Sequence, residues 1–212
     1  MSTLGALKAT IADDLARPNL TNQIAAAITA AIDHYKGERF WFNVTRAETW
    51  LMVADRASYT SADDAAVPLF LDLDAMFIED ADGIRYELTR IDPVDMESLL
   101  DESASSSRPD SYSYYDETFY FHPIPDLSTY TIRPMGLIEV AAPASDSETG
   151  NPWMVYCYQL IRCRAKWDLF AHTIMAPDKA GGMNVMEMDA LAELRRKTSR
   201  RTATGQIKPT SF

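Results

Sequence analysis

Apolar and polar residues alternate at helical spacing from the start of the chain. The pattern predicts a short amphipathic helix over residues 3–15, with Thr3 as its N-cap. This helix must end before Arg17, because the residue that precedes a proline is disfavoured in the α region. The apolar positions of the helix are Leu4, Leu7, Ile11 and Leu15.

A second stretch with helical spacing covers residues 22–36, with Thr21 as the expected N-cap. Gly37 is well placed to end this helix. Alanines occupy much of its remaining surface, and such small side chains allow neighbouring helices or subunits to approach closely. The apolar stripe consists of Ile24, Ile28, Ala31 or Ile32, and Tyr35.

Between residues 40 and 143 the helical spacing gives way to β-branched and aromatic residues separated by turn signals. The segment YYDETFYFHPIPD predicts a hairpin around Asp116 and Glu117. Within the same region DPVDMESLLDE predicts a short helix with Asp92 as its N-cap. Strands are expected over residues 45–53, 69–78, 84–91, 112–115, 118–121 and 129–138.

Helical spacing resumes at Asn151, the expected N-cap, and continues to about residue 174. Pro152 then occupies the first helical position, where its missing N–H does no harm. The segment MAPDKAGG predicts a turn, after which a last helix is expected over residues 184–197. The apolar stripe of the first helix is Met154, Tyr158, Ile161, Ala165 and Leu169, and that of the last is Met186, Ala190 and Leu194.

These elements predict an α+β fold in which helices from both ends of the chain form a bundle around a β-rich insert. We expect one domain over residues 1–197. Its helical body comprises residues 3–37 and 151–197, and its insert comprises residues 40–143. The remaining residues, 198–212, are polar, basic and without pattern, which predicts an extended tail.

Large aromatic side chains are concentrated where the second helix gives way to the β-rich insert, at HYKGERFWFN. If this stretch is a strand, Phe40 and Phe42 share one face and Trp41 takes the other. We interpret it as a packed structural connection between helical body and insert; a ligand-binding aromatic cluster is the alternative. The residues of this aromatic junction are Tyr35, Phe40, Trp41, Phe42 and Trp153.

Charge is distributed unevenly along the chain. The formal net charge is -11, yet no acidic residue follows Glu193, and six basic residues do. Residues 1–194 therefore carry a charge of -17. A body this acidic repels a phosphate backbone, whereas the basic C-terminal segment suits a nucleic acid or an acidic patch on a protein. No apolar run approaches the roughly 20 residues that span a bilayer, so no membrane is expected as a partner.

No catalytic motif is recognisable, and we expect neither an enzyme nor a cofactor. The histidines, His34, His122 and His172, are too widely separated to suggest a zinc site. Cys157 and Cys163 lie six residues apart and face different sides of a helix, which suggests a reduced, cytosolic thiol pair.

Two other functions stay open on the sequence. Carboxylates such as those of Asp72 and Asp74 are numerous enough to supply the pair that glycoside hydrolysis needs, which allows a small hydrolase acting on peptidoglycan. The aromatic hairpin of residues 112–121 is an alternative platform for binding a sugar or a nucleic acid, although its neighbours are acidic. A β-core with its rim explains these aromatic residues better.

The order of these segments resembles the head-to-tail adaptor, or connector, proteins of tailed bacteriophages, chiefly of the short-tailed type. The resemblance covers about residues 3–195. It rests on the helix that ends in RFWFN, then DGIRYELTRID and DMESLL, then SYYDETFYFHPIPD, and finally NPWMVYCYQLI.

The resemblance implies a structural virion protein that forms a ring, usually twelvefold, below the portal protein. Such a ring joins head to tail, extends the DNA channel and presents a platform to tail or nozzle proteins. DNA then passes through without sequence-specific binding, and the protein resides at the head–tail interface after synthesis in the host cytoplasm. Residues expected to contact the portal or a neighbouring subunit are Arg195, Arg196, Lys197, Arg200, Arg201, Ile207, Lys208 and Phe212.

Overall fold

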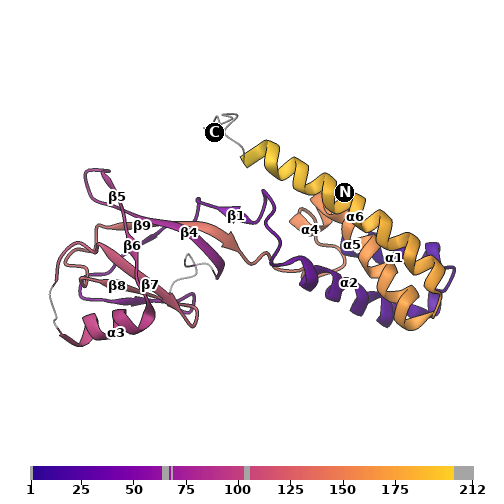
Figure 1. Ribbon diagram of the computed structural model, residues 1–212, viewed down its shortest axis with the longest axis horizontal. Helices are drawn as coiled ribbons and strands as arrows, with labels where there is room; N and C mark the ends of the chain where they lie inside the picture. The colour runs from indigo at the N-terminus through magenta and orange to yellow at the C-terminus, as the bar shows by residue number, and fades with distance from the viewer. Residues whose placement is uncertain (1, 64–66, 68, 103–105, 203–212) are drawn as a thin grey trace, which may run out of the picture. The chain divides into compact units, whose positions relative to one another are not determined.

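A computed structural model describes residues 2–63, 67, 69–102 and 106–202 of the chain (Figure 1). The fold is α+β. Both ends of the chain contribute helices, and the residues between them in the sequence form two β-sheets and one further helix. Two compact units are distinguished: the helical unit, Met1–Phe42 with Val140–Phe212, and the sheet unit, Asn43–Glu139.

The helical unit is built from helices that lie side by side, with α5 in contact with α1, α2 and α6 (Figure 1). Thr3 caps the first helix as predicted, since its Oγ1 accepts a hydrogen bond from the Ala6 N–H at 3.2 Å. The elements are α1 (Leu4–Leu15), the 3₁₀ turn η1 (Pro18–Leu20), α2 (Thr21–Tyr35), α4 (Pro152–Tyr156), α5 (Tyr158–Asp168), the π-helical turn η2 (Leu169–Thr173) and α6 (Pro177–Thr202).

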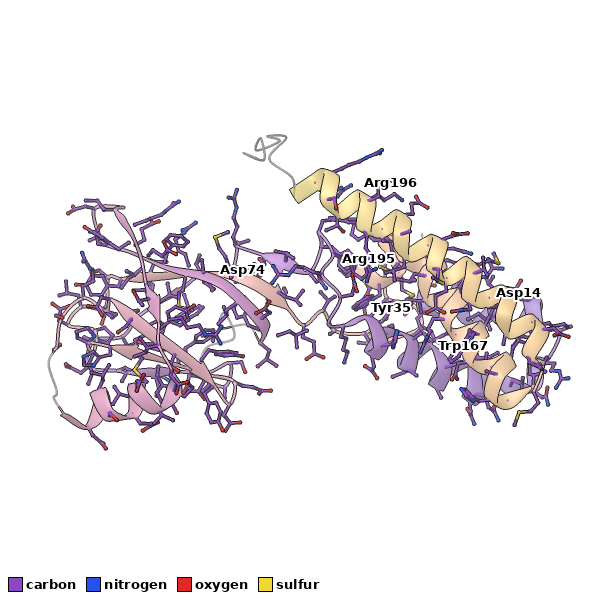
Figure 2. All side chains as sticks on the ribbon, viewed as in Figure 1. Asp14, Tyr35, Asp74, Trp167, Arg195 and Arg196 are labelled. Carbon is purple, nitrogen blue, oxygen red and sulfur yellow. The ribbon has the colours of Figure 1, made fainter. Side chains whose placement is uncertain are left out.

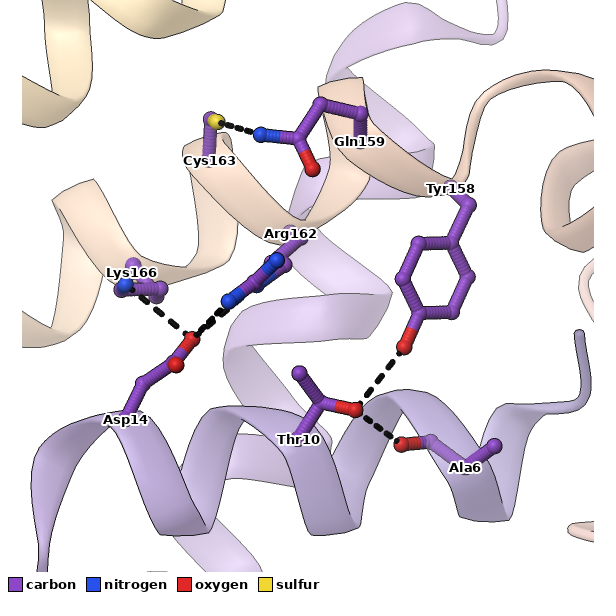
Figure 3. Close-up of polar contacts among 8 residues, drawn as sticks. All are labelled: Ala6, Thr10, Asp14, Tyr158, Gln159, Arg162, Cys163 and Lys166. Carbon is purple, nitrogen blue, oxygen red and sulfur yellow. Dashed lines mark hydrogen bonds and ion pairs between the residues drawn. The ribbon is translucent and has the colours of Figure 1, made fainter.

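The predicted apolar stripes meet in the core of the helical unit, which includes Leu7, Ile28, Ile161 and Leu169. Beside this core an ion pair joins α1 to α5: Asp14 accepts from Arg162 at 2.6 Å and from Lys166 at 3.1 Å (Figure 3). Burial alone would raise the pKa of Asp14, but hydrogen bonds from the two cations lower it below its usual value. On the same side of α1, the Thr10 hydroxyl pairs with that of Tyr158 at 3.0 Å (Figure 3).

Several helix boundaries differ from the prediction. Thr21 is the first residue of α2 and not its N-cap, because the η1 turn leads directly into the helix. The helix expected from 151 to 174 is interrupted at Cys157, whose φ of -109° and ψ of 10° separate α4 from α5. Asn151 nevertheless caps α4 as predicted, by accepting from the Trp153 N–H at 3.1 Å.

The last helix begins at Pro177, seven residues earlier than predicted, so the turn expected over MAPDKAGG is confined to its first two residues and the rest of the segment is helical. The chain turns at Met175, which has a φ of 58°. Gly181 and Gly182 lie within α6 although each lowers helix propensity by about 1 kcal/mol, and they directly follow the buried Ala180.

The sheet unit contains two sheets and one helix, α3 (Pro93–Glu102). Sheet A has the order β1-β9-β4-β5, with β2 also paired to β9, and all of its pairs are antiparallel. Its strands are β1 (Val44–Thr45), β2 (Trp50–Leu51), β4 (Phe70–Glu79), β5 (Arg85–Glu87) and β9 (Thr131–Ile138). Sheet B has the order β3-β8-β7-β6, with strands β3 (Ser58–Tyr59), β6 (Thr89–Arg90), β7 (Ser111–Tyr115) and β8 (Thr118–His122).

The core of the sheet unit lies between the two sheets. Met76, Ile78 and Ile132 of sheet A are fully buried there, together with Phe119 and Phe121 of sheet B. The other face of sheet B is covered by α3, which contacts β7 and β8 (Figure 1). The unit therefore has three layers, namely sheet A, sheet B and α3. Among the described residues of this unit, no further helix or sheet covers the outer face of sheet A.

The hairpin and the α3 cap were predicted correctly. Asp116 and Glu117 form the tight turn between β7 and β8, with φ values of 50° and 57° that suit such a turn. Asp92 caps α3 by accepting from the Val94 N–H at 2.9 Å.

Other strands were predicted less well. The strand expected over residues 45–53 is two short pieces, and the one over 84–91 divides into β5 and β6, which belong to different sheets. The two-residue strand β3 was missed because it is too short to show a period.

The aromatic junction is not a strand, so the assignment of Phe40 and Phe42 to one strand face was wrong. Residues 41–43 form a turn, and the first strand begins only at Val44. Phe40 is fully buried in the core of the helical unit, and its ring stacks on that of Phe42 with centroids 5.3 Å apart. Both rings meet Trp153 edge to face. Aromatic packing onto α4 therefore replaces the predicted pleat.

Candidate assembly surface

The C-terminal end of α6 carries all the predicted interaction residues that the structure describes. This helix has 26 residues and packs along α5 through Ala180, Glu187 and Leu194, each no more than 5% exposed. Residues 198–202, expected to belong to an extended tail, are helical. Ile207, Lys208 and Phe212 lie outside the described residues.

Arg195 attaches α6 to the end of α2. Its Nε and Nη2 donate to the two carboxylate oxygens of Glu38, both at 2.8 Å, in a bidentate ion pair. The hydrogen bond from Arg195 lowers the pKa of Glu38 below its usual value despite partial burial. Arg195 is thus engaged within the helical unit, although its side chain is 57% exposed.

Arg201 is also engaged within its own unit. Its guanidinium lies 4.6 Å from the ring centroid of Trp41, a cation–π contact that connects the end of α6 with the aromatic junction. Lys197 pairs with Glu193 one turn earlier at 2.6 Å. These contacts explain why the helix continues past Lys197, where the sequence pattern ends.

Arg196 and Arg200 are exposed and show no ion pair within the part of the chain that the structure describes. Figure 2 shows Arg196 on the outer side of α6, whereas Arg195 lies on the side turned towards Tyr35. Two of the five described cations are therefore exposed without an ion pair, and the remaining three contact neighbouring residues.

A buried polar network beside this surface was not predicted. The Tyr35 hydroxyl donates to Oε1 of Glu187, and Arg164 donates to the same oxygen at 3.3 Å. Burial, followed by the Glu187 carboxylate, raises the pKa of Tyr35 above its ordinary value. Arg164 in turn stacks on Trp167, with 4.5 Å between guanidinium and ring centroid. The network holds α2, α5 and α6 together.

The sequence contains only a weak signal that Glu187 is buried. The predicted stripe ran through Met186, yet Met186 is 46% exposed and Glu187 takes the inward position instead. Glu187 stands seven residues before Leu194, two helical turns away on the same face, which was the available signal. A carboxylate at that position is counted as a surface residue unless its partners are known.

The cysteines and the inward aromatic residues of the hairpin, which were considered for other chemistry, are buried. Cys157 and Cys163 are both free and buried, and burial raises the pKa of Cys157 to about 12. The inward aromatics of the hairpin, Phe119 and Phe121, form core as preferred from sequence. Across the described ranges, no three His, Cys, Asp or Glu side chains are grouped so that they could hold a metal ion. Nor does any helix there have the length and apolar character to cross a membrane.

The helical unit is thus a bundle whose C-terminal helix ends in exposed cations. The chain belongs to the SU10 adaptor protein family, whose model matches residues 2–209. This match confirms the resemblance to phage head-to-tail adaptors and indicates a structural protein of the phage particle. No curated protein matches the chain significantly.

Proposed function

We propose that the protein forms a ring that binds below the portal protein, joins head to tail and extends the DNA channel. We expect this ring to have twelve subunits, as is usual for the adaptor proteins that the chain resembles. The observation that supports this function is the adaptor-family match over nearly the whole chain. The ring resides at the head–tail interface of the virion and presents its far side to tail or nozzle proteins. It needs no cofactor and catalyses no reaction.

The charge of the sheet unit agrees with a channel through which DNA slides. Residues 43–139 contain twenty acidic residues against six basic ones. A wall of this charge repels phosphates, so DNA passes without binding.

The end of α6 is proposed as the contact with the portal or with a neighbouring subunit. Arg196 and Arg200 supply outward positive charge, and residues 203–212 follow directly after them. A heterologous ring needs two different subunit faces, and a C-terminal segment that reaches a neighbour provides one element of such a contact.

Mixing the purified protein with isolated portal rings tests the function. We expect a stoichiometric ring complex in negative-stain electron microscopy and a corresponding increase in mass by light scattering. Absence of any complex under assembly conditions would overturn the proposal. No particular observation on the described residues favours the peptidoglycan hydrolase or the sugar- or nucleic-acid-binding module, so neither is proposed.

A further inference from the structure

Three arginines surround a hollow on the outer face of sheet A. The hollow has a volume of about 380 Å³ and is lined by Arg46, Phe77, Arg85, Arg133 and Met135. The register places these residues together: Phe77 of β4 pairs directly with Arg133 of β9, and β5 contributes Arg85 beside them. Because Met76 and Ile78 point into the core, Phe77 between them points to the opposite face.

This arginine hollow is unusual in its surroundings. The sheet unit has only six basic residues, all arginine, and half of them line this one hollow. Glu79 accepts from Arg85 at 2.6 Å and from Arg133 at 3.5 Å, and Glu87 pairs with Phe77 on the same face. Arg46 is exposed and shows no ion pair in the described segments. The hollow therefore keeps an excess of positive charge on an acidic unit.

The opposite side of the sheet unit has the complementary character. From Asp92 to Glu102, α3 and its cap contain five acidic residues and no basic one. A second hollow of about 450 Å³ lies there, with an apolar lining that includes Val94 and Tyr115, and with Glu97 beside it. Val94 is 73% exposed and Tyr115 is 66% exposed, so apolar surface accompanies the carboxylates.

We propose that the arginine hollow of one copy binds the acidic α3 face of the next copy, as the subunit contact of the ring. The inference rests on the proposed function and adds the surfaces that meet. A closed ring requires different faces on the two sides of each subunit, and here the two faces lie on opposite outer layers of one unit (Figure 1).

The chemistry of the two faces fits. Arginine forms bidentate ion pairs with carboxylates and stacks on aromatic rings, so Arg46 and Arg85 suit a surface that offers Glu97 and Tyr115. Asp101 is exposed one helical turn after Glu97 and adds a second carboxylate to the same side of α3. Phe77 and Met135 supply apolar area to meet Val94. Charge steers the copies into this orientation and disfavours contact between two acidic faces.

Two charge-reversed variants test the contact. The arginine-reversed variant carries Arg46→Glu with Arg85→Glu, and the acid-reversed variant carries Glu97→Arg with Asp101→Arg. Each variant alone should need at least about tenfold more protein than the wild type for half-maximal ring formation, because like charges face each other. Mixed in equal amounts, the two variants should again form rings, since every contact in an alternating ring then joins opposite charges.

Arg17→Glu with Arg90→Glu is the matched control, because it makes the same charge change at exposed positions outside the hollow. Circular dichroism and the thermal midpoint verify that each variant folds. Rings formed normally by both reversed variants, or a mixture that fails to restore rings, would overturn the contact. Intact rings that have lost portal binding would instead assign the hollow to the portal, which also overturns it. Wild-type protein that forms no ring even when mixed with isolated portal rings contradicts the proposed function itself, so the two failures are distinguishable.

Discussion

Glu187 shows how strongly the role of a single residue depends on its surroundings. The carboxylate is 5% exposed, and it is held by the Tyr35 hydroxyl and Arg164. Its second oxygen, Oε2, has no hydrogen-bond partner among the described residues. Such a group stabilises the fold through its partners, because removing it leaves the buried Tyr35 hydroxyl and the partly buried Arg164 without their shared acceptor.

Replacing Glu187 by alanine should lower the free energy of unfolding by about 2–4 kcal/mol, since Tyr35 and Arg164 lose their shared acceptor. Glu187→Gln retains an acceptor oxygen and should cost less. Urea denaturation followed by circular dichroism measures both. The exposed neighbour Asp189→Ala is the control, and an equal loss in the control would contradict a specific role for Glu187.

The ion pair of Asp14 should make the free energy of unfolding depend on pH. Its pKa is lower in the folded than in the unfolded chain, so its ionised form stabilises the fold above about pH 4. This contribution disappears as the pH falls through the lowered pKa. Asp14→Asn should therefore be less stable than the wild type at pH 7, and the difference should narrow towards pH 3.

Denaturation midpoints between pH 7 and pH 3 measure the Asp14 effect. Asp13→Asn provides the control, because Asp13 is exposed and shows no ion pair in the described part of the chain. A difference between Asp14→Asn and wild type that stays constant across this range would refute the assignment.

At the scale of elements, two glycines have opposite roles. Gly136 of β9 lies where a Cβ would be 2.3 Å from the carbonyl oxygen of Asp72, next to the irregular register between β4 and β9. Gly181 is helical in α6, and a Cβ there would meet nothing within 4 Å. The first glycine is required by close backbone approach, and the second only weakens its helix.

Gly136→Ala should therefore destabilise the protein by about 1–3 kcal/mol, because the strands must move apart. Gly181→Ala should stabilise it by about 0.5–1 kcal/mol, since alanine favours the helix and restricts the unfolded chain. Thermal or urea unfolding of the pair measures both signs. Destabilisation by Gly181→Ala would contradict a helix that begins at Pro177.

At the scale of the whole molecule, the end of α6 marks the boundary between residues needed for folding and residues proposed for assembly. Leu194 packs in the helical core, and Arg195 and Arg201 contact Glu38 and Trp41. The part of the chain needed for the fold therefore extends past Lys197. Residues 203–212 follow this part and lie outside the described residues, and we assign them to the proposed portal or subunit contact.

Truncation after Thr202 should leave the thermal midpoint within about 2 °C of the wild type and weaken portal binding. Truncation after Ala192 removes Leu194, Arg195 and Arg201 and should lower the midpoint substantially. Thermal unfolding and a portal pull-down read out the two effects separately. Loss of folding in the longer variant would show that residues 203–212 belong to the folded body.

The sequence by itself determined the α+β class, the α1, α2 and α3 helices, the hairpin at Asp116 and Glu117, and the family. These features depend on spacing, caps and turn residues, which act over a few positions. Periodicity could not place short strands such as β3, nor show that the chain from Ile84 to Ile91 is shared between two sheets.

Only the tertiary structure decided which residues far apart in the chain meet. Glu187 is buried because α2 and α5 bring Tyr35 and Arg164 to it. In the sequence, Tyr35 is 152 positions and Arg164 is 23 positions away from Glu187. Arg46, Arg85 and Arg133 are isolated in the sequence and become one hollow through the pairing of β1, β9, β4 and β5. Local patterns do not encode such contacts, because strand order and helix packing are fixed by the burial of apolar surface over the whole unit.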